Sequence, residues 1–277
     1  MLPFIKIFGF TVPMYSLCIE VGVFFAVLVL FYDCKQKNVL WNDAVIIGVT
    51  GIGIGFAGAK LLYVITAYSP HEIGKIIFEG RLEYISNGGF VFYGGFIFGI
   101  IGALIGARIS KSKLMVYENV LVKLIPLVHA FGRVGCFCAG CCYGRPIRTG
   151  FGVVYTNPAS DAPCGIKLLP VQLYEATFNM LLFAIMIFID KKKPSNKILL
   201  PVYLIGYSIE RFIIEYFRYD EIRGRFLCLT TSQWISAGLF VVGILVIFVR
   251  RKLQQICGFD KLYAILNGRN KQGKNVL

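Results

Sequence analysis

Runs of about 20 apolar residues alternate with more polar connections along most of the chain, and the connections at about 68–88 and 136–170 are the long ones. A helix needs roughly 20 consecutive apolar residues to cross the hydrocarbon core of a bilayer. The pattern therefore predicts seven transmembrane helices, at about 12–33, 44–67, 89–108, 114–135, 171–190, 198–217 and 232–249. The fourth run is the most interrupted by polar residues, since it contains Glu118, Lys123 and His129.

The composition also indicates a membrane protein, because 57% of the 277 residues are hydrophobic and only 16% are charged. We expect an all-α integral membrane protein of about seven transmembrane helices, with a cap of loops on the outer, periplasmic side. Residues 1–250 are predicted to form a single polytopic membrane domain, and residues 251–277 a polar cytoplasmic tail. The first apolar run is long enough to span and has only Lys6 before it, so we interpret it as a retained helix.

The net charge of +14 is concentrated on one side of the predicted helices. Sixteen of the 29 Lys and Arg residues follow the first, third, fifth and seventh helices, within 35–37, 108–113, 191–197 and 250–274. Cytoplasmic connections carry such an excess, so the N-terminus is predicted outside and the C-terminus in the cytoplasm. Topology and attraction to anionic membrane lipids explain the basic charge, and binding to nucleic acid is not expected.

Two arginines lie within apolar runs, Arg133 at the end of one and Arg211 inside another. Ionisable groups at membrane depth are costly, so they usually face the protein interior and pair with another group. Guanidinium groups bind phosphate or carboxylate through two parallel hydrogen bonds. The pair therefore predicts a clamp for the phosphate of a phospholipid. The alternative is that each arginine pairs with an acidic neighbour, Glu210 or Glu215, for structure alone.

A polar stripe marks the sixth predicted helix. Its members are spaced i, i+4, i+8 and i+11 and therefore share one helical face, predicted to line a cavity: Tyr207, Arg211, Glu215 and Arg218. A second candidate is the pair Gly94 and Gly95 near the start of the third helix. Paired glycines permit close approach of an anion to free helix amides, although they equally favour packing between helices.

Three longer motifs occur in order along the chain. They are Gly-Arg-x-Gly-x-Phe…Tyr-Gly-Arg at 132–145, Pro-x-Gln-Leu-Tyr-Glu at 170–175, and Tyr-x-x-x-Arg-Phe-x-x-Glu-x-x-Arg at 207–218. With these motifs on seven spans, the chain resembles the prolipoprotein diacylglyceryl transferases of bacteria. That family moves a diacylglyceryl group from phosphatidylglycerol to the thiol of the lipobox cysteine in a prolipoprotein signal peptide. The resemblance implies a bacterial cytoplasmic membrane enzyme that releases glycerol phosphate and needs no metal or cofactor.

The resemblance extends to single residues. Ten positions match the family pattern and are candidates for binding the substrates or for catalysis: Tyr15, Arg133, Gly144, Gln172, Tyr174, Glu175, Tyr207, Arg211, Glu215 and Arg218. Six polar positions of the family are replaced here: Lys60 stands for Arg, Tyr93 and Leu169 for His, Cys136 and Ala139 for Asn, and Cys141 for Glu. These replacements leave open a non-catalytic, lipid-binding relative.

The reaction assigns roles to some of these residues. We expect Arg133 and Arg211 to hold the charge of the leaving phosphate, and Glu215 to orient an arginine. Tyr93 takes the place of the family histidine, but the ordinary pKa of tyrosine, about 10, makes it a poor base. His129 lies four residues before Arg133 on the same helical face, which makes it another candidate base. Thiolate formation by the local positive field is the alternative.

The chain has nine cysteines, four of which form the sequence Cys-x-Cys-x-x-Cys-Cys at 136–142. Cys138 and Cys141 have the spacing of a redox motif, so a membrane thiol-disulfide oxidoreductase is the competing function. A structural disulfide or simple filling of a tight turn are the other interpretations. The run could also hold a metal, but no other His or Cys completes a convincing zinc site, and we predict none.

Overall fold

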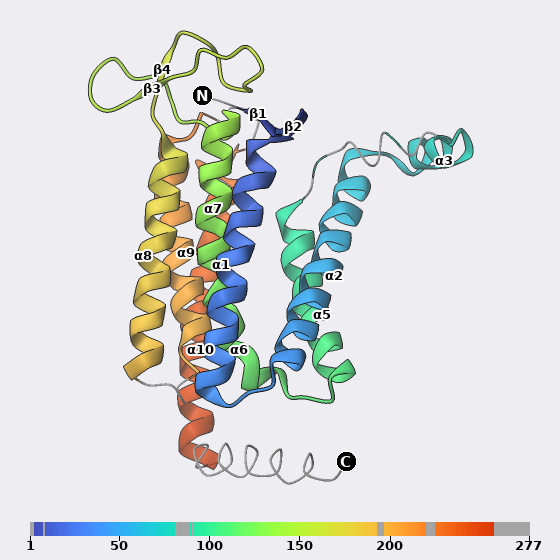
Figure 1. Cartoon of the computed structure of the whole chain (residues 1–277), viewed down its shortest axis with the longest axis vertical. Helices are drawn as coiled ribbons and strands as arrows, with labels where there is room; N and C mark the ends of the chain where they lie inside the picture. The colour runs from blue at the N-terminus through green and yellow to red at the C-terminus, as the bar shows by residue number, and fades with distance from the viewer. Residues whose placement is uncertain are drawn as a thin grey trace. The chain divides into compact units, whose positions relative to one another are not determined.

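The computed structural model of the chain describes residues 3–7, 9–80, 83, 89, 91–192, 197–219 and 225–257, which are mostly helical (Figure 1). They divide into two compact units. The first unit comprises residues 1–29 and 122–277, and the second comprises residues 30–121. Five stretches of the described residues are long and apolar enough to cross a membrane. The prediction of an all-α membrane protein is therefore confirmed.

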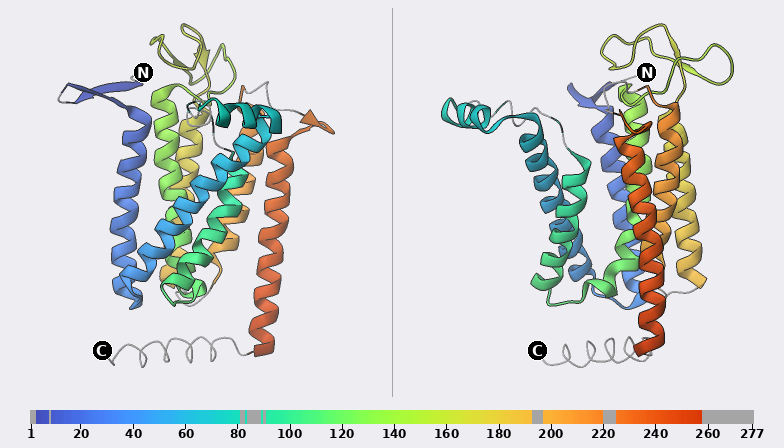
Figure 2. Two further views of the ribbon diagram at one scale, coloured as in Figure 1. Left: turned by 90° about the vertical axis from the view of Figure 1, so that its right-hand side faces the viewer. Right: turned by 180° about the vertical axis from the view of Figure 1, so that it is seen from behind.

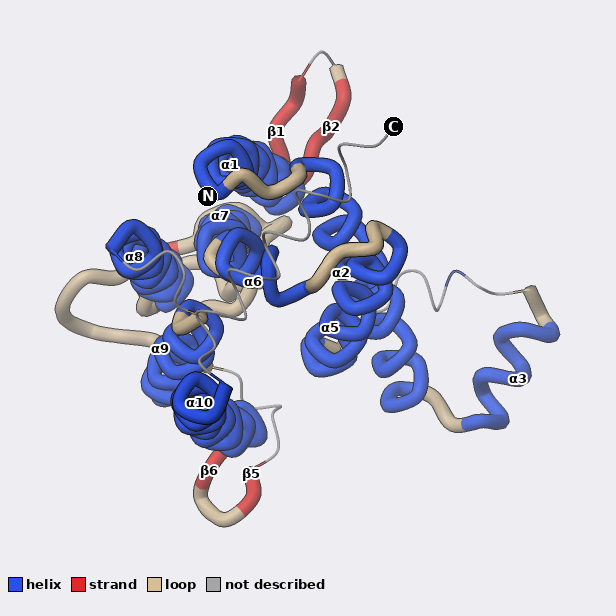
Figure 3. The backbone as a smooth tube through the Cα atoms, turned by 90° about the horizontal axis from the view of Figure 1, so that it is seen from below, coloured by secondary structure: helices blue, strands red, loops and turns tan. Residues whose placement is uncertain are grey.

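The helices of the first unit run side by side (Figures 1 and 3). α7 packs against α8, α8 against α9, and α9 against α10. On α1, Gly22 leaves room for Phe131 of α7, since a Cβ atom on Gly22 would lie 2.7 Å from the Cβ of Phe131. The bounds of these helices are α1 (Met14–Lys37, whose residues 14–29 belong to this unit), α7 (Leu124–Ala139), α8 (Val171–Lys192), α9 (Leu199–Ile214) and α10 (Thr231–Cys257).

The predicted fourth span is divided into two helices, α6 (Leu114–Val122) and α7. Pro126 has no N–H to donate to the carbonyl oxygen of Val122, so the helical hydrogen bonding is interrupted between Val122 and Leu124. Lys123, at the break, is buried and forms an ion pair with Asp190 of α8. An ion pair with α8 therefore lies at the point where the fourth span is interrupted.

Three small antiparallel hairpins lie at one end of the helices of the first unit (Figure 2). The long connection between α7 and α8 has its own small core, in which Tyr155 packs with Ala162 and Leu168. The strands are β1 (Phe4–Ile7), β2 (Phe10–Pro13), β3 (Val153–Val154), β4 (Lys167–Leu168), β5 (Arg225–Phe226) and β6 (Leu229–Thr230).

The second unit is built on α2 (Trp41–Ala67) and α5 (Phe92–Ile109), which pack along their length (Figure 3). Glycines make this contact close, because a Cβ atom on Gly94 would overlap the carbonyl oxygen of Gly58. A Cβ atom on Gly102 would likewise lie 2.5 Å from the carbonyl oxygen of Thr50. Small residues let membrane helices approach in this way. The unit also contains α3 (Pro70–Phe78).

Two predicted boundaries differ from the structure. α9 ends at Ile214 rather than near 217, and a short 3₁₀ helix, η1 (Glu215–Phe217), follows it. α10 continues to Cys257, so the predicted polar tail begins as helix. Residues 258–277 of that tail lie outside the described residues. The single membrane domain at 1–250 stays a prediction.

Candidate functional site

A shared carboxylate joins two of the predicted arginines in the first unit. Glu175 lies near the start of α8 and is fully buried. Its Oε2 is 2.7 Å from Nε of Arg133 on α7, and its Oε1 is 3.1 Å from Nη1 of Arg218. A buried charge is stable only when it is paired. Because two cations share one anion, this group of three, the Glu175 cluster, carries a net positive charge.

The third arginine pairs with its own neighbour. Nη2 of Arg211 lies 2.6 Å from Oε2 of Glu215, one helical turn away, and donates a hydrogen bond to Ser232 at 3.2 Å. Oε1 of Glu215 accepts a hydrogen bond from Thr230 at 3.0 Å. Nη1 of Arg211 is buried and has no hydrogen-bond partner among the described residues. This donor is therefore available to a ligand.

Arg218 reaches Glu175 from outside the helix on which it was predicted to lie. The backbone at Arg218 is extended, with φ −76° and ψ 154°, and it pairs with Gly144. The backbone N–H of Arg145 donates to the carbonyl oxygen of Phe217, and the N–H of Tyr219 donates to that of Tyr143. These bonds to the α7–α8 connection replace the helical ones. The predicted common helical face therefore ends at Glu215.

His129 and Tyr207 adjoin the Glu175 cluster. Nε of Arg133 donates a hydrogen bond to Nε2 of His129 at 3.1 Å, which occupies the lone pair of that nitrogen. The ring centroids of His129 and Tyr207 are 5.7 Å apart. Tyr207 is buried and stacks on Tyr203 at 5.9 Å. His129 therefore supports the side chain of Arg133 directly, and Tyr207 packs against His129. The role of His129 as a base stays a prediction.

Gln172 and Gly144 hold the α7–α8 connection in place. Gln172 is fully buried, and its Nε2 donates to the carbonyl oxygen of Cys141 at 2.7 Å. It also donates to the hydroxyl of Tyr155 at 3.4 Å, and burial raises the pKa of Tyr155 to about 12. A Cβ atom on Gly144 would lie 2.6 Å from the carbonyl oxygen of Leu169. Gln172 and Gly144, both predicted to bind substrate, therefore hold the backbone of this connection.

The remaining predicted site residues form none of these ion pairs, although Tyr15 interacts electrostatically with Arg133. Tyr15 and Tyr174 are 42% and 43% exposed. The backbone of Tyr15 packs against Gly135 of α7, where an added Cβ atom would be 3.1 Å away. In the second unit, Gly94 and Gly95 pack against α2. The last two are Tyr93, whose side chain lies outside the described residues, and Lys60, which lies over the ring of Tyr63.

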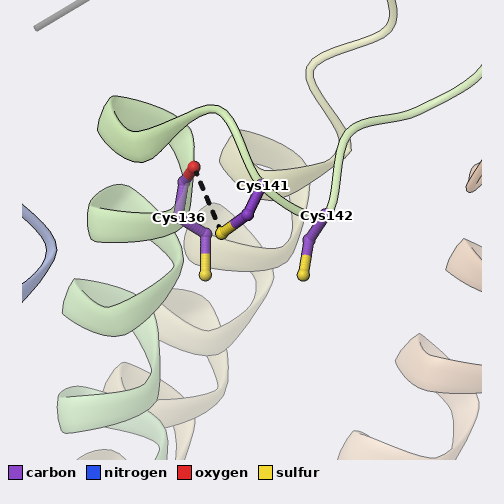
Figure 4. Close-up of side chains that lie close together, drawn as sticks. All are labelled: Cys136, Cys141 and Cys142. Atoms are coloured by element: carbon purple, nitrogen blue, oxygen red, sulfur yellow. Dashed lines mark hydrogen bonds between the residues drawn. The ribbon is translucent and has the colours of Figure 1, made fainter. Parts of the chain in front are cut away.

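The cysteine turn follows α7. Gly140 ends the helix with φ 82°, and Cys142 also has a positive φ of 57°. The Sγ atoms of Cys136, Cys141 and Cys142 all lie within 4.8 Å of one another (Figure 4). We call this group the thiol triad. None of the eight cysteines whose side chains are described forms a disulfide.

The arrangement of the turn separates the two cysteines with redox-motif spacing. Cys141 lies in the thiol triad, whereas Cys138 interacts with Cys18 of α1. Hydrogen bonds from Cys136 and Cys141, together with nearby Arg218 and Arg133, hold the pKa of Cys142 well below its usual range. Hydrogen bonding to Cys136 and Cys142 raises the pKa of Cys141. Within the triad, Cys142 is therefore the thiol whose pKa is lowered.

Glu210 is a site residue that the sequence suggested only as a partner for an arginine. It is buried on α9, and neither carboxylate oxygen accepts a hydrogen bond from the described part of the chain. It interacts electrostatically with Glu175 and with all three arginines. A charged residue inside an apolar run was the available signal. Ser232 and Thr230, which support Arg211 and Glu215, gave none.

The sequence profile of the prolipoprotein diacylglyceryl transferase family matches residues 3–249. The chain belongs to this family. Membership agrees with the resemblance seen in the three motifs, and the carboxylate of Glu175 from the second motif joins Arg133 of the first to Arg218 of the third.

Several prolipoprotein diacylglyceryl transferases are similar over nearly the whole chain. The phosphatidylglycerol–prolipoprotein diacylglyceryl transferase of Clostridium tetani is 33% identical over 252 residues, which cover 90% of this chain and 98% of the relative. Transferase 2 of Clostridium perfringens is 31% identical over 246 residues, covering 87% and 91%. The transferase of Dehalococcoides mccartyi is 32% identical over 247 residues, covering 88% and 91%.

Proposed function

We propose that this protein transfers a diacylglyceryl group from phosphatidylglycerol to the thiol of the lipobox cysteine in prolipoproteins. Family membership and the names of the similar transferases support both substrates. The observation that carries the proposal is the set of three arginines beside α7, α8 and α9, which includes one buried guanidinium nitrogen without a partner among the described residues. An anionic headgroup phosphate matches this surplus of donors.

In the reaction, the acceptor thiolate attacks the diacylglyceryl carbon that bears the phosphate ester. A carbon–sulfur bond forms as the carbon–oxygen bond breaks, and glycerol phosphate leaves with the electron pair. Arg133 and Arg211 hold the growing charge on the phosphate, and Nη1 of Arg211 supplies a free donor. Donors fixed in a site of low polarity stabilise such a charge strongly. Glu215 keeps Arg211 in position.

The acceptor thiol must lose its proton, because the thiolate is the nucleophile. We infer that the positive field of Arg133, Arg211 and Arg218 favours this loss. Proton uptake at Nε2 of His129 would break its hydrogen bond with Arg133, which argues for the field over the histidine. The role of Tyr93 as a base stays a prediction.

The orientation of the helices in the membrane is proposed from the distribution of basic residues. We propose seven spans in the bacterial cytoplasmic membrane, with α5 and α9 as the two shorter ones, an outer N-terminus and a cytoplasmic C-terminus. The hairpins of the first unit and the α7–α8 connection then cap the outer side, where the half-exposed Tyr15 and Tyr174 contact lipid. Gly94 and Gly95 pack against α2, and their role in binding stays a prediction. The supporting features are the basic connections on one side and the gathering of the first unit's hairpins at one end (Figure 2).

The test is transfer by the purified protein in nanodiscs, with labelled phosphatidylglycerol and a lipobox peptide. We expect a thioether-linked diacylglyceryl peptide and released glycerol phosphate in equal amounts. A peptide with Ser in place of the lipobox cysteine should stay unmodified. Binding of phosphatidylglycerol without any transfer would instead identify a lipid-binding relative.

A further inference from the structure

The thiol triad is the one group of at least three potential metal-ligating side chains that the described residues bring together. It combines one cysteine from the last turns of α7 with two from the following turn (Figure 4). No step of the transfer uses these thiols, because the acceptor supplies its own. We propose that Cys136, Cys141 and Cys142 form a three-thiolate site for a thiophilic d10 metal ion, Zn²⁺ or Cu⁺.

The distances suit such an ion. A zinc–sulfur bond is about 2.3 Å long, so three sulfurs in a plane around the ion stand about 4.0 Å apart. The sulfurs of the triad are at most 4.8 Å apart, and small rotations of the side chains close that difference. Soft thiolate ligands select Zn²⁺ and Cu⁺ over harder cations.

The backbone of the turn is held in the required shape. Cys142 has φ 57°, a conformation that non-glycine residues adopt rarely and that the surrounding structure must maintain. Gly140 has φ 82°, and a Cβ atom there would lie 2.7 Å from the Cβ of Ser160. Gln172 fixes the carbonyl of Cys141 at 2.7 Å. Ligands held by such supporting contacts are preorganised for binding.

The charges also match. Three thiolates with Zn²⁺ carry a net charge of −1, and with Cu⁺ a charge of −2. Arg133 interacts electrostatically with Cys136 and Cys142, and Arg218 with Cys142. The metal complex is therefore an anion beside two guanidinium groups, which compensates a charge held away from water. The protons that binding displaces from the thiols pass to solvent.

The experiment uses the full-length protein, purified in detergent, reduced and freed of metal. Cd²⁺ is titrated as a spectroscopic probe, and the sulfur-to-cadmium charge-transfer absorbance is followed. We expect one ion per chain with the amplitude of three thiolates, displaced by Zn²⁺ or by Cu⁺ under reducing conditions. The variant Cys141→Ser/Cys142→Ser should lose the band. Its affinity should fall by more than about 100-fold, since even loss of a supporting contact costs about 10- to 100-fold.

The matched control is Cys164→Ser/Cys228→Ser, which removes two exposed thiols outside the triad and should titrate like the wild type. If the double variant inserts poorly, the single variant Cys142→Ser is titrated in its place. Its absorbance band should have the amplitude of two thiolates instead of three. Absence of the band in wild type, or binding that survives in the triad variants, overturns the proposal. A disulfide between two triad cysteines in the protein as isolated overturns it as well.

Discussion

Replacing Arg211 with Gln separates the catalytic use of this arginine from its structural use. The substitution removes both the ion pair with Glu215 at 2.6 Å and the free Nη1 donor. Loss of one donor to a developing oxyanion costs about 2.7–4 kcal/mol, or about 100- to 1000-fold in turnover. We therefore expect transfer to fall by that factor in Arg211→Gln.

The same substitution should also destabilise the protein. The side chains of Arg211 and Glu215 are 9% and 3% exposed, so Glu215 would be left as a buried, unpaired charge. Breaking a buried pair in this way costs about 3–5 kcal/mol. The double variant Arg211→Gln/Glu215→Gln removes that charge, while the new amide oxygen can still accept the hydrogen bond from Thr230. It should recover most of the stability but none of the activity.

Two measurements on both variants test this reasoning. Thermal unfolding in detergent reports the stability, and single-turnover transfer of labelled diacylglyceryl to a lipobox peptide reports the chemical step. Arg211→Gln should be low in both, and the double variant low only in transfer. Near-normal transfer by a stable double variant would remove Arg211 from the mechanism. In that case Arg211 would act on folding alone.

Four further outcomes are expected. Arg133→Ala should abolish transfer in assays of labelled lipid. The variant should still insert normally, because Glu175 keeps Arg218 as a partner at 3.1 Å; full activity would contradict the role of Arg133 in holding the phosphate. Reporter fusions at Lys113 and Lys192 should read cytoplasmic and one near Pro163 external, and any reversal would overturn the topology. The variant with Ser at positions 136, 138, 141 and 142 should lose rate or stability only modestly and work under reducing conditions; complete loss in Cys138→Ser alone would instead favour a dithiol redox cycle. Gly144→Ala should lower stability by about 1–3 kcal/mol through contact with Leu169, whereas Gly132→Ala, with no atom within 4 Å of the added carbon, should not, as thermal unfolding will show.

Hydropathy located the helices well but not their interruptions. α8 begins at Val171, directly after Pro170, as the sequence predicts. The apolar run of the sixth span continues through Phe217, yet the helix ends at Ile214 because the following backbone bonds to the distant α7–α8 connection. Such pairing between remote segments leaves no local pattern in the sequence.

The same limit applies to the site. The contact between Arg211 and Glu215 follows from their i, i+4 spacing. The bridge from Arg133 through Glu175 to Arg218 joins three separate segments, and spacing alone cannot reveal it. The cysteine turn shows this most clearly, because the redox spacing suggested Cys138 with Cys141, while the left-handed backbone at Gly140 and Cys142 gathers a different set.

The shared carboxylate of Glu175 has an entropic consequence. A free arginine side chain populates many rotamers, and immobilising one on binding costs about 0.5–1.5 kcal/mol. Glu175 has already immobilised Arg133 and Arg218 in the folded protein. For two side chains the saving is about 1–3 kcal/mol, or about 5- to 150-fold in affinity. Folding, rather than the arriving ligand, therefore orders these two cations before the phosphate binds.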